Sequence, residues 1–113
     1  MGKILQGTTP TLRIRVNPDL FSVEDLSDIE LTLWQGDAIR VLDLSSVTVD
    51  AEANVIAYHF TREETLALNA NRGLGWQILF FFPDGNTAGT DQHVISVKRL
   101  KSKEVHDVSD NNG

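Results

Sequence analysis

The sequence predicts a mainly β fold, namely one antiparallel β-sandwich of about seven strands with one short helix. Three features carry this prediction. Apolar and polar residues alternate in several short segments, residues typical of turns separate these segments at nearly regular intervals, and a single segment has the pattern of a capped helix. Many short strands with frequent turns are the pattern of a sandwich or of a partly open barrel, and the alternation does not distinguish the two.

The first half of the chain contains four expected strands. In residues 12–16 three aliphatic side chains alternate with two arginines, and in residues 29–34 the aliphatic positions alternate with polar ones so that Trp34 falls on the opposite face. Residues 38–42 follow after a Gly-Asp pair, which predicts a tight hairpin. Residues 47–49 form a further short segment.

The second half contains three expected strands and the helix. Residues 55–60 place Ile56, Tyr58 and Phe60 on one face, which we expect to point inward. The helix is expected near residues 62–70, because Thr61 and Glu64 have the spacing of a capping box. Such a short helix is stable only when it docks on the sheet, so a structural crossover is its expected role. The last strand is expected over residues 94–97.

The most apolar strand is expected over residues 75–82. Trp76, Phe80 and Phe82 alternate onto one side of it, and Phe81 falls on the other side. Because both sides are apolar, this strand should be central and covered on both faces, or covered on one face by a partner subunit.

Length and composition limit the classes of protein. The chain has 113 residues, no cysteine and a formal charge of −6, and no apolar run approaches the length of a membrane helix. We expect one domain over residues 1–101 and a disordered tail over residues 102–113. The negative charge argues against nucleic acid and anionic membranes as partners, and the basic segment at residues 98–103 is interpreted as a solvated strand end.

The sequence contains no pattern that indicates catalysis or a cofactor. His59, His93 and His106 do not have the spacing of a metal site, and Glu63 and Glu64 are neighbours that point in different directions on a helix. No serine has the glycine-flanked context of an activated nucleophile. We therefore expect a protein that is not an enzyme and holds no metal or cofactor.

The aromatic residues form the candidate interaction surface. It consists of five residues from two expected strands: Trp34, Trp76, Phe80, Phe81 and Phe82. Large aromatic side chains of this kind belong to the core, to an oligomer contact, or to a platform on which sugar rings stack. The core and the oligomer contact are the favoured alternatives, and the phenylalanine run is either an exposed contact or buried.

One stretch is more specific than the composition. The opening QGTTPTL at residues 6–12, the strand over residues 29–34, the segment at residues 60–66 and the turn at residues 83–85 follow one another along residues 4–100. This order resembles small proteins encoded in phage and prophage genomes, and it is similar to the immunoglobulin-like domains of virions and baseplates. The resemblance implies an immunoglobulin-like sandwich and no catalytic residues.

The expected function follows from this resemblance. It is a structural protein of a phage or prophage, associated with the virion, tail or baseplate, that acts through protein–protein contacts. Its expected partners are other phage structural proteins or further copies of itself. The expected location is the cytoplasm of a bacterial host during assembly, and then the virion. The alternative is a carbohydrate- or surface-binding module that uses exposed aromatic residues, and a small hydrolase or metal enzyme ranks last.

Overall fold

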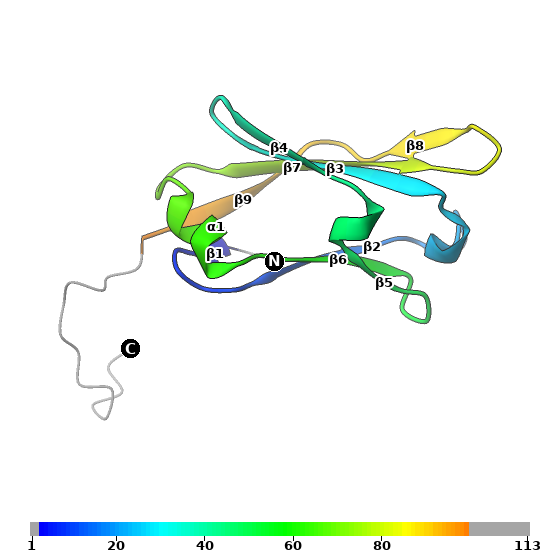
Figure 1. The fold of residues 1–113 in the computed structure, drawn as a ribbon, viewed down its shortest axis with the longest axis horizontal. Helices are drawn as coiled ribbons and strands as arrows, with labels where there is room; N and C mark the ends of the chain where they lie inside the picture. The colour runs from blue at the N-terminus through cyan, green and yellow to red at the C-terminus, as the bar shows by residue number, and fades with distance from the viewer. Residues whose placement is uncertain (1–2, 100–113) are drawn as a thin grey trace.

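A computed structural model describes residues 3–99 and shows two β-sheets packed face to face (Figure 1). The expected tail, residues 102–113, lies outside the described residues. The elements are β1 (Lys3–Leu5), β2 (Thr11–Arg15), the 3-10 helix η1 (Val23–Asp25), β3 (Asp28–Gln35), β4 (Ala38–Leu42), the 3-10 helix η2 (Leu44–Ser46), β5 (Thr48–Asp50), β6 (Val55–His59), α1 (Arg62–Ala67), β7 (Leu74–Phe81), β8 (Thr87–Gly89) and β9 (His93–Lys98).

The strands form one large and one small sheet. The six-stranded sheet has the order β1-β9-β7-β3-β4, with β8 also paired to β7, and the three-stranded sheet has the order β2-β6-β5. The expected sandwich with one short α-helix is therefore confirmed. Two details differ from the expectation: the described residues form nine strands, and β1 pairs with β9 in parallel. The strands missing from the prediction, β1 and β8, have three residues each, which is too short for an alternation to be visible.

The core lies between the two sheets and is built from the alternating aliphatic positions. Burying each such side chain contributes roughly 1.5–3 kcal/mol. The positions of β6 expected to point inward do so, and the aliphatic sets expected to share one face of β2 and of β3 lie on the inner side. The most deeply buried aliphatic residues are Ile4, Ile29, Leu31, Ile56, Ile78 and Val97.

The hairpin between β3 and β4 fixes the register of the sheet edge. Gln35 pairs with Ala38, so the loop consists of Gly36 and Asp37 alone. Gly36 has φ +61° and Asp37 has an ordinary negative φ, which is the pattern of a type II′ turn. The tight hairpin expected from the Gly-Asp pair is thereby confirmed.

Strand β7 is central, as expected. On one side it pairs along its length with β3. On the other side β9 pairs with its first residues and β8 with its last. Thr90 spans the junction between these two partners, since its amide donates to the carbonyl of Ile78 and its Oγ1 accepts from the amide of Ile78.

Helix α1 begins with the expected capping box but ends earlier than expected. The Thr61 side chain accepts from the Glu64 amide and the Glu64 side chain accepts from the Thr61 amide. The helix ends at Ala67, because side chains from elsewhere hold the next backbone groups: Gln6 Nε2 donates to the carbonyl of Leu68, and Gln35 binds the amide and carbonyl of Asn69. A continued helix would have to break these bonds.

The N-terminal opening packs directly on this helix. Thr65 is completely buried, and its Oγ1 accepts from the amide of Gly7 and donates to the carbonyl of Thr8. Two of the segments that carry the resemblance, residues 6–12 and residues 60–66, are therefore in contact. This contact ties the helix to the loop between β1 and β2.

Candidate interaction surface

The six-stranded sheet has one face on the core and one face turned away from the second sheet. Five apolar side chains on the face turned away form what we call the outer apolar face, namely Trp34, Ile39, Val41, Leu79 and Val94. Phe81, at the end of β7, points to the same side but is not counted in this set. Ile39 and Val94 are 68% and 72% exposed, Val41 is 56% exposed, and Leu79 is 37% exposed, whereas Trp34 is half-buried. Among the described residues no element covers this face (Figure 1).

The register places most of these side chains in one row across four strands. Ile39 of β4 is opposite Trp34 of β3, Trp34 is opposite Gly75 of β7, and Gly75 is opposite Val94 of β9. Cross-strand partners point to the same face of a sheet. The row is therefore continuous from the free edge of β4 to β9.

Three members of the outer apolar face lie over glycines of a neighbouring segment. A Cβ atom on Gly75 would lie 2.3 Å from Cε2 of Trp34, one on Gly73 would lie 2.4 Å from Cγ1 of Val94, and one on Gly89 would lie 2.7 Å from Cδ2 of Leu79. Each distance is far below a van der Waals contact. The three side chains thus occupy the space that a larger neighbour would take, and they lie against the backbone of these segments.

The Trp34 ring lies face-on against Gly75. The same Cβ position would be 2.5 Å from Cζ2 and 2.6 Å from Nε1, the two ring atoms bonded to Cε2. If the Cβ position lay in the ring plane, beyond the ring edge, it would be closer to these two atoms than to Cε2. Because it is slightly farther from them than from Cε2, it lies above the ring plane. The second face of the indole therefore points outward from the sheet.

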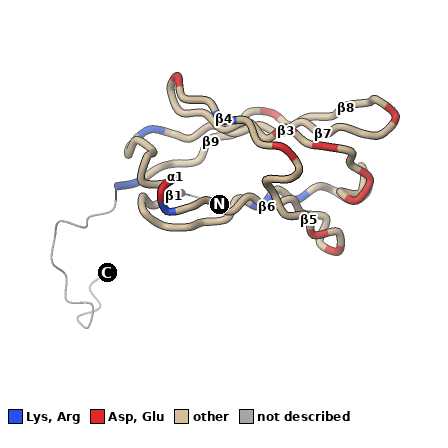
Figure 2. Tube along the Cα trace, viewed as in Figure 1, with Lys and Arg blue, Asp and Glu red and all other residues tan. Residues whose placement is uncertain are grey.

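Charged residues are scarce on the strands of the large sheet. Figure 2 shows acidic residues in the turns, many of them at the end of the sandwich away from α1. Strand β7 carries no charged residue, and Arg40 of β4 points to the inner side. The outward side of the sheet nevertheless carries Asp28 and Glu30 of β3 and Lys98 of β9, with Glu30 opposite Leu79, whereas the row from Ile39 through Trp34 to Val94 has no charged residue.

The structure divides the five aromatic residues of the predicted surface. Trp34 and Phe81 lie on the outward side of the sheet, both half-buried. Phe80 is only 4% exposed and belongs to the core, so it offers no surface to a partner. Phe82 is half-buried and packs edge-on against Phe21 with the ring centroids 5.0 Å apart.

Trp76 lies apart from this surface. It shares the inward-pointing side of β7 with Phe80, and its ring stacks on His93 at 4.5 Å between ring centroids. The five predicted residues therefore do not form one patch. Trp34 and Phe81 remain on the outward side. The exposed neighbours of Trp34 are aliphatic, so a prediction based on aromatic residues does not include them.

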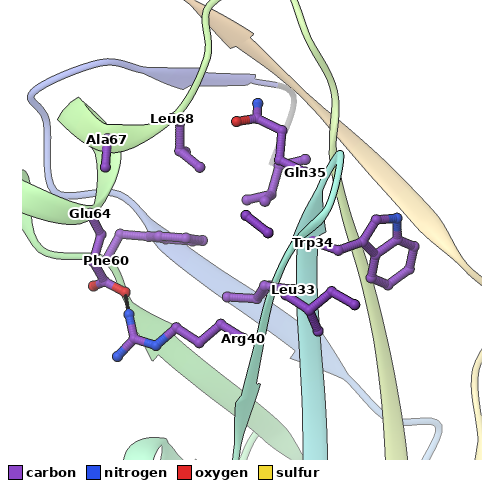
Figure 3. A pocket seen from close by; sticks show the side chains of 11 residues that line it. Leu33, Trp34, Gln35, Arg40, Phe60, Glu64, Ala67 and Leu68 are labelled. Atoms are coloured by element: carbon purple, nitrogen blue, oxygen red, sulfur yellow. Dashed lines mark hydrogen bonds and ion pairs between the residues drawn. The ribbon is translucent and has the colours of Figure 1, made fainter.

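A pocket of about 260 Å³ lies at the other side of the β3–β4 hairpin, facing α1 (Figure 3). Its apolar wall consists of Leu33, Phe60, Ala67, Leu68 and Leu74. In Figure 3 Phe60 points into the pocket, whereas Trp34 projects away from it on the far side of the sheet. The pocket and the outer apolar face are therefore on opposite sides of the same hairpin.

A small polar cluster stands beside the pocket. Arg40 forms an ion pair with Glu64, and the Tyr58 hydroxyl donates to the same carboxylate oxygen. Burial raises the pKa of Tyr58, and the nearby Arg40 charge opposes this only in part. The cluster binds β4, β6 and α1 together, and each of its groups has a partner.

The described residues contain no group of three or more potential metal ligands. His59 is bound between Thr11 and Thr48, and His93 is stacked on Trp76, so the two described histidines lie in separate surroundings. Asp84 accepts from the Asn86 amide in the turn after β7, which accounts for this pair of oxygen-bearing residues. Over residues 3–99 no helix has the length and apolar character needed to cross a membrane.

No protein-family model matches this chain, and no curated protein matches it significantly.

Proposed function

We propose that this chain is a structural protein that works through protein–protein contacts, and that the outer apolar face is its contact surface. The carrying observation is the exposed row from Ile39 through Trp34 to Val94 on a sheet face that no described element covers. Apolar side chains gathered on one exposed face mark interaction sites more often than isolated ones do. The core of a protein interface is depleted of charge, and the row from Ile39 to Val94 likewise carries none, while Glu30 opposite Leu79 borders it.

The position of these side chains supports an assembly contact. Trp34, Val94 and Leu79 lie against the backbone at Gly75, Gly73 and Gly89 and present apolar surface on one side of the sheet. An apolar sheet face can pack on the sheet of another subunit. We propose further copies of this chain, or other structural proteins of the same particle, as the partners.

A phage or prophage particle is the setting that the sequence resemblance favours. The opening at residues 6–12 and the segment at residues 60–66 carry that resemblance, and they contact each other through Thr65. We propose that the chain is an immunoglobulin-like domain that forms part of a virion, tail or baseplate. We propose no catalytic step for it.

The carbohydrate-binding alternative uses the outward face of the Trp34 ring. A sugar platform requires polar side chains around the ring to bind the hydroxyl groups. The directly paired neighbours of Trp34 are Ile39 and Gly75, which supply none, and the nearest polar side chains on this side, Thr32 and Gln77, are two residues further along their strands. The apolar row through Trp34 therefore favours a protein partner.

The test is the molar mass in solution, measured by light scattering behind a sizing column across a wide concentration range. The unmodified protein should form an oligomer, and Val94→Lys should dissociate it, because it places a charge in the apolar contact. Leu20→Lys is the matched control, since Leu20 is 74% exposed and lies outside the sheets. The control should leave the oligomer intact.

Two results would contradict the proposal. The first is a monomer at every concentration, which would exclude self-assembly through this face. The second is an oligomer that Val94→Lys and Val41→Lys leave unchanged, which would place the contact elsewhere. Circular dichroism of each variant checks that the fold is retained.

A further inference from the structure

Strand β4 offers a free row of backbone hydrogen-bonding groups. Among the described strands it pairs with β3 alone. Gln35 and Ala38 close the two-residue hairpin and so exchange both of their backbone hydrogen bonds, and bonded pairs then alternate along the strands. The amides and carbonyls of Ile39 and Val41 consequently point away from β3, toward the open edge.

The pocket beside α1 opens along this same edge. Its exposed lining residues lie on β4 and on α1, and they include Ala38, Arg40 and Ala67. The pocket measures about 260 Å³. An apolar cavity of about 150 Å³ in another protein is large enough to bind benzene, so this pocket has room for a large aliphatic or aromatic side chain.

Ala38 controls access to the pocket. Its side chain points to the inner side together with that of Arg40, and both residues line the pocket into which Phe60 points (Figure 3). A strand added antiparallel to the β4 edge would place residues opposite Ala38 and Arg40 in non-hydrogen-bonded pairs, whose side chains approach most closely. Residues opposite these two positions are two apart in the added strand.

Arg40 supplies a charge at the position next to the pocket. Its side chain is 54% exposed, and among the described residues only its Nη1 has an acceptor, the Glu64 carboxylate. A guanidinium carries five donors in a planar fork, so further donors can bind a second carboxylate. Glu64 also accepts from the Thr61 amide and from Tyr58, which fixes the position of Arg40.

A second copy of β4 is a poor occupant of this edge. In the antiparallel register that pairs Ile39 with Val41 of a copy, Arg40 is opposite Arg40 and Asp37 is opposite Asp43, and like charges directly opposite one another destabilise a strand pair. In the register that pairs Ile39 with Ile39, Arg40 is opposite Ala38, so a guanidinium and not an apolar side chain would meet the pocket, and no carboxylate would face Arg40. The edge therefore matches a segment with another charge pattern, carrying a carboxylate where β4 has its arginine.

We propose that the β4 edge binds an extended segment of a different protein as an added strand. This segment places a large apolar side chain opposite Ala38, in the pocket, and an aspartate or glutamate opposite Arg40, two residues away. Backbone bonds to Ile39 and Val41 supply affinity, and the pocket and the arginine supply specificity. The inference goes beyond the proposed function, because it concerns the edge and inner side of the hairpin and not the outer apolar face.

The experiment selects binders from a random library of short linear peptides displayed on particles, using the immobilised full chain. The selected peptides should share an apolar residue and an acidic residue two positions apart. One selected peptide is then synthesised with a fluorescent label, and its binding to the protein is measured by fluorescence anisotropy. Ala38→Phe should fill the pocket, and Val41→Pro should remove an edge donor without breaking a bond to β3, since proline is tolerated on edge strands. Each should weaken binding at least about tenfold, a loss of ~1.4 kcal/mol.

Matched variants separate the edge from other causes. Val41→Thr keeps the amide and should bind as the unmodified chain does, and Val94→Lys alters only the outer apolar face and should also bind normally. Peptides without the two-residue spacing, or binding that survives both Ala38→Phe and Val41→Pro in folded protein, would overturn the inference. Dissociation of a self-oligomer by Ala38→Phe would overturn it too, because Ala38 points to the inner side, away from the outer apolar face, and the occupant of the edge would then be a second copy.

Discussion

The indole ring of Trp34 lies face-on over the backbone of Gly75, its cross-strand partner on β7. Glycine in a central strand normally weakens the sheet, because it adds no side chain to pack. A large aromatic ring from the next strand covers this gap and restores packing, as is known for designed sheets. The pair also supplies the centre of the outer apolar face.

The first prediction tests this pair by double substitution. Gly75→Ala should destabilise the fold by about 1–3 kcal/mol, because the new Cβ would displace the ring. In a Trp34→Ala background the same change should be close to neutral or stabilising, which is a coupling within the usual range of about 0.5–3 kcal/mol for residues in contact. The measurement is urea denaturation followed by circular dichroism for all four proteins. Additive effects of the two changes would show that the ring does not rest on Gly75.

The sequence contained the glycines but not their role. Gly73 and Gly75 leave the helix and enter β7, and glycines at such a boundary have an ordinary local explanation. Their function under Val94 and Trp34 depends on which strands become neighbours. That pairing is a long-range property that a single sequence does not reveal, so the outer apolar face could not be assembled from it.

Strand β4 shows a second limit of the alternation rule. In residues 38–42 the apolar Ile39 and Val41 flank Arg40, and the simplest interpretation turns the arginine to solvent. The two-residue hairpin instead pairs Ile39 with Trp34 and so turns both aliphatic residues outward. Arg40 is tolerated on the inner side because Glu64 neutralises it. By contrast, the strands that cover the core were predictable, since burial on one face selects their side chains directly.

The second prediction concerns Asn54, which is buried in the turn before β6. Its φ is +57°, its Nδ2 donates to the carbonyls of Val16 and Phe21, and its Oδ1 accepts from the amide of Val23 at 2.8 Å. Asn54→Gly keeps the left-handed backbone but removes all three bonds. We expect a loss of about 3 kcal/mol, since each buried group left without a partner costs about 1–3 kcal/mol.

Asn71 provides the matched control for this change. It has φ +66° and is exposed, so Asn71→Gly keeps the backbone and removes no buried hydrogen bond. Its effect should stay within about 0.5 kcal/mol. Equal destabilisation by the two substitutions in urea denaturation would contradict the role assigned to the Asn54 amide.

The third prediction compares two adjacent acidic residues at the start of α1. Glu64 completes the capping box and also accepts from Arg40 and Tyr58, whereas Glu63 is exposed. Glu64→Ala should destabilise the protein by about 2 kcal/mol, which combines a lost cap with the unsatisfied Tyr58 hydroxyl. Glu63→Ala should stay within about 0.5 kcal/mol.

Glu64→Gln separates the two roles of this side chain. Glutamine can replace glutamate in a capping box, where its one amide oxygen accepts from the Thr61 amide. Its NH2 group then stands where the second carboxylate oxygen accepts from Tyr58 and Arg40, so the ion pair with the half-exposed Arg40 is lost and the Tyr58 hydroxyl has to accept rather than donate. Exposed ion pairs contribute about 0–1 kcal/mol, and the glutamine variant should accordingly lie between the other two. Thermal unfolding of the three variants under one set of conditions provides the ranking, and a glutamine variant as unstable as the alanine variant would refute the separation.

The fourth prediction is a loss of stability at high pH that originates at Tyr58. Burial raises the pKa of this phenol, so the folded protein holds the proton more tightly than the unfolded chain does. The contribution of this protonated phenol to the free energy of unfolding is fully present below the ordinary tyrosine pKa of about 10. It is lost as the pH rises through the raised pKa of the folded state. An ionised Tyr58 would also face the Glu64 carboxylate, to which the hydroxyl now donates.

Because Tyr58 is the only tyrosine in the chain, the ultraviolet absorbance of tyrosinate reports its titration directly. We expect a midpoint above that of the urea-unfolded protein and a fall in the free energy of unfolding that is smaller in Tyr58→Phe. Coincident midpoints in the folded and unfolded protein would show that the hydroxyl is not buried against Glu64.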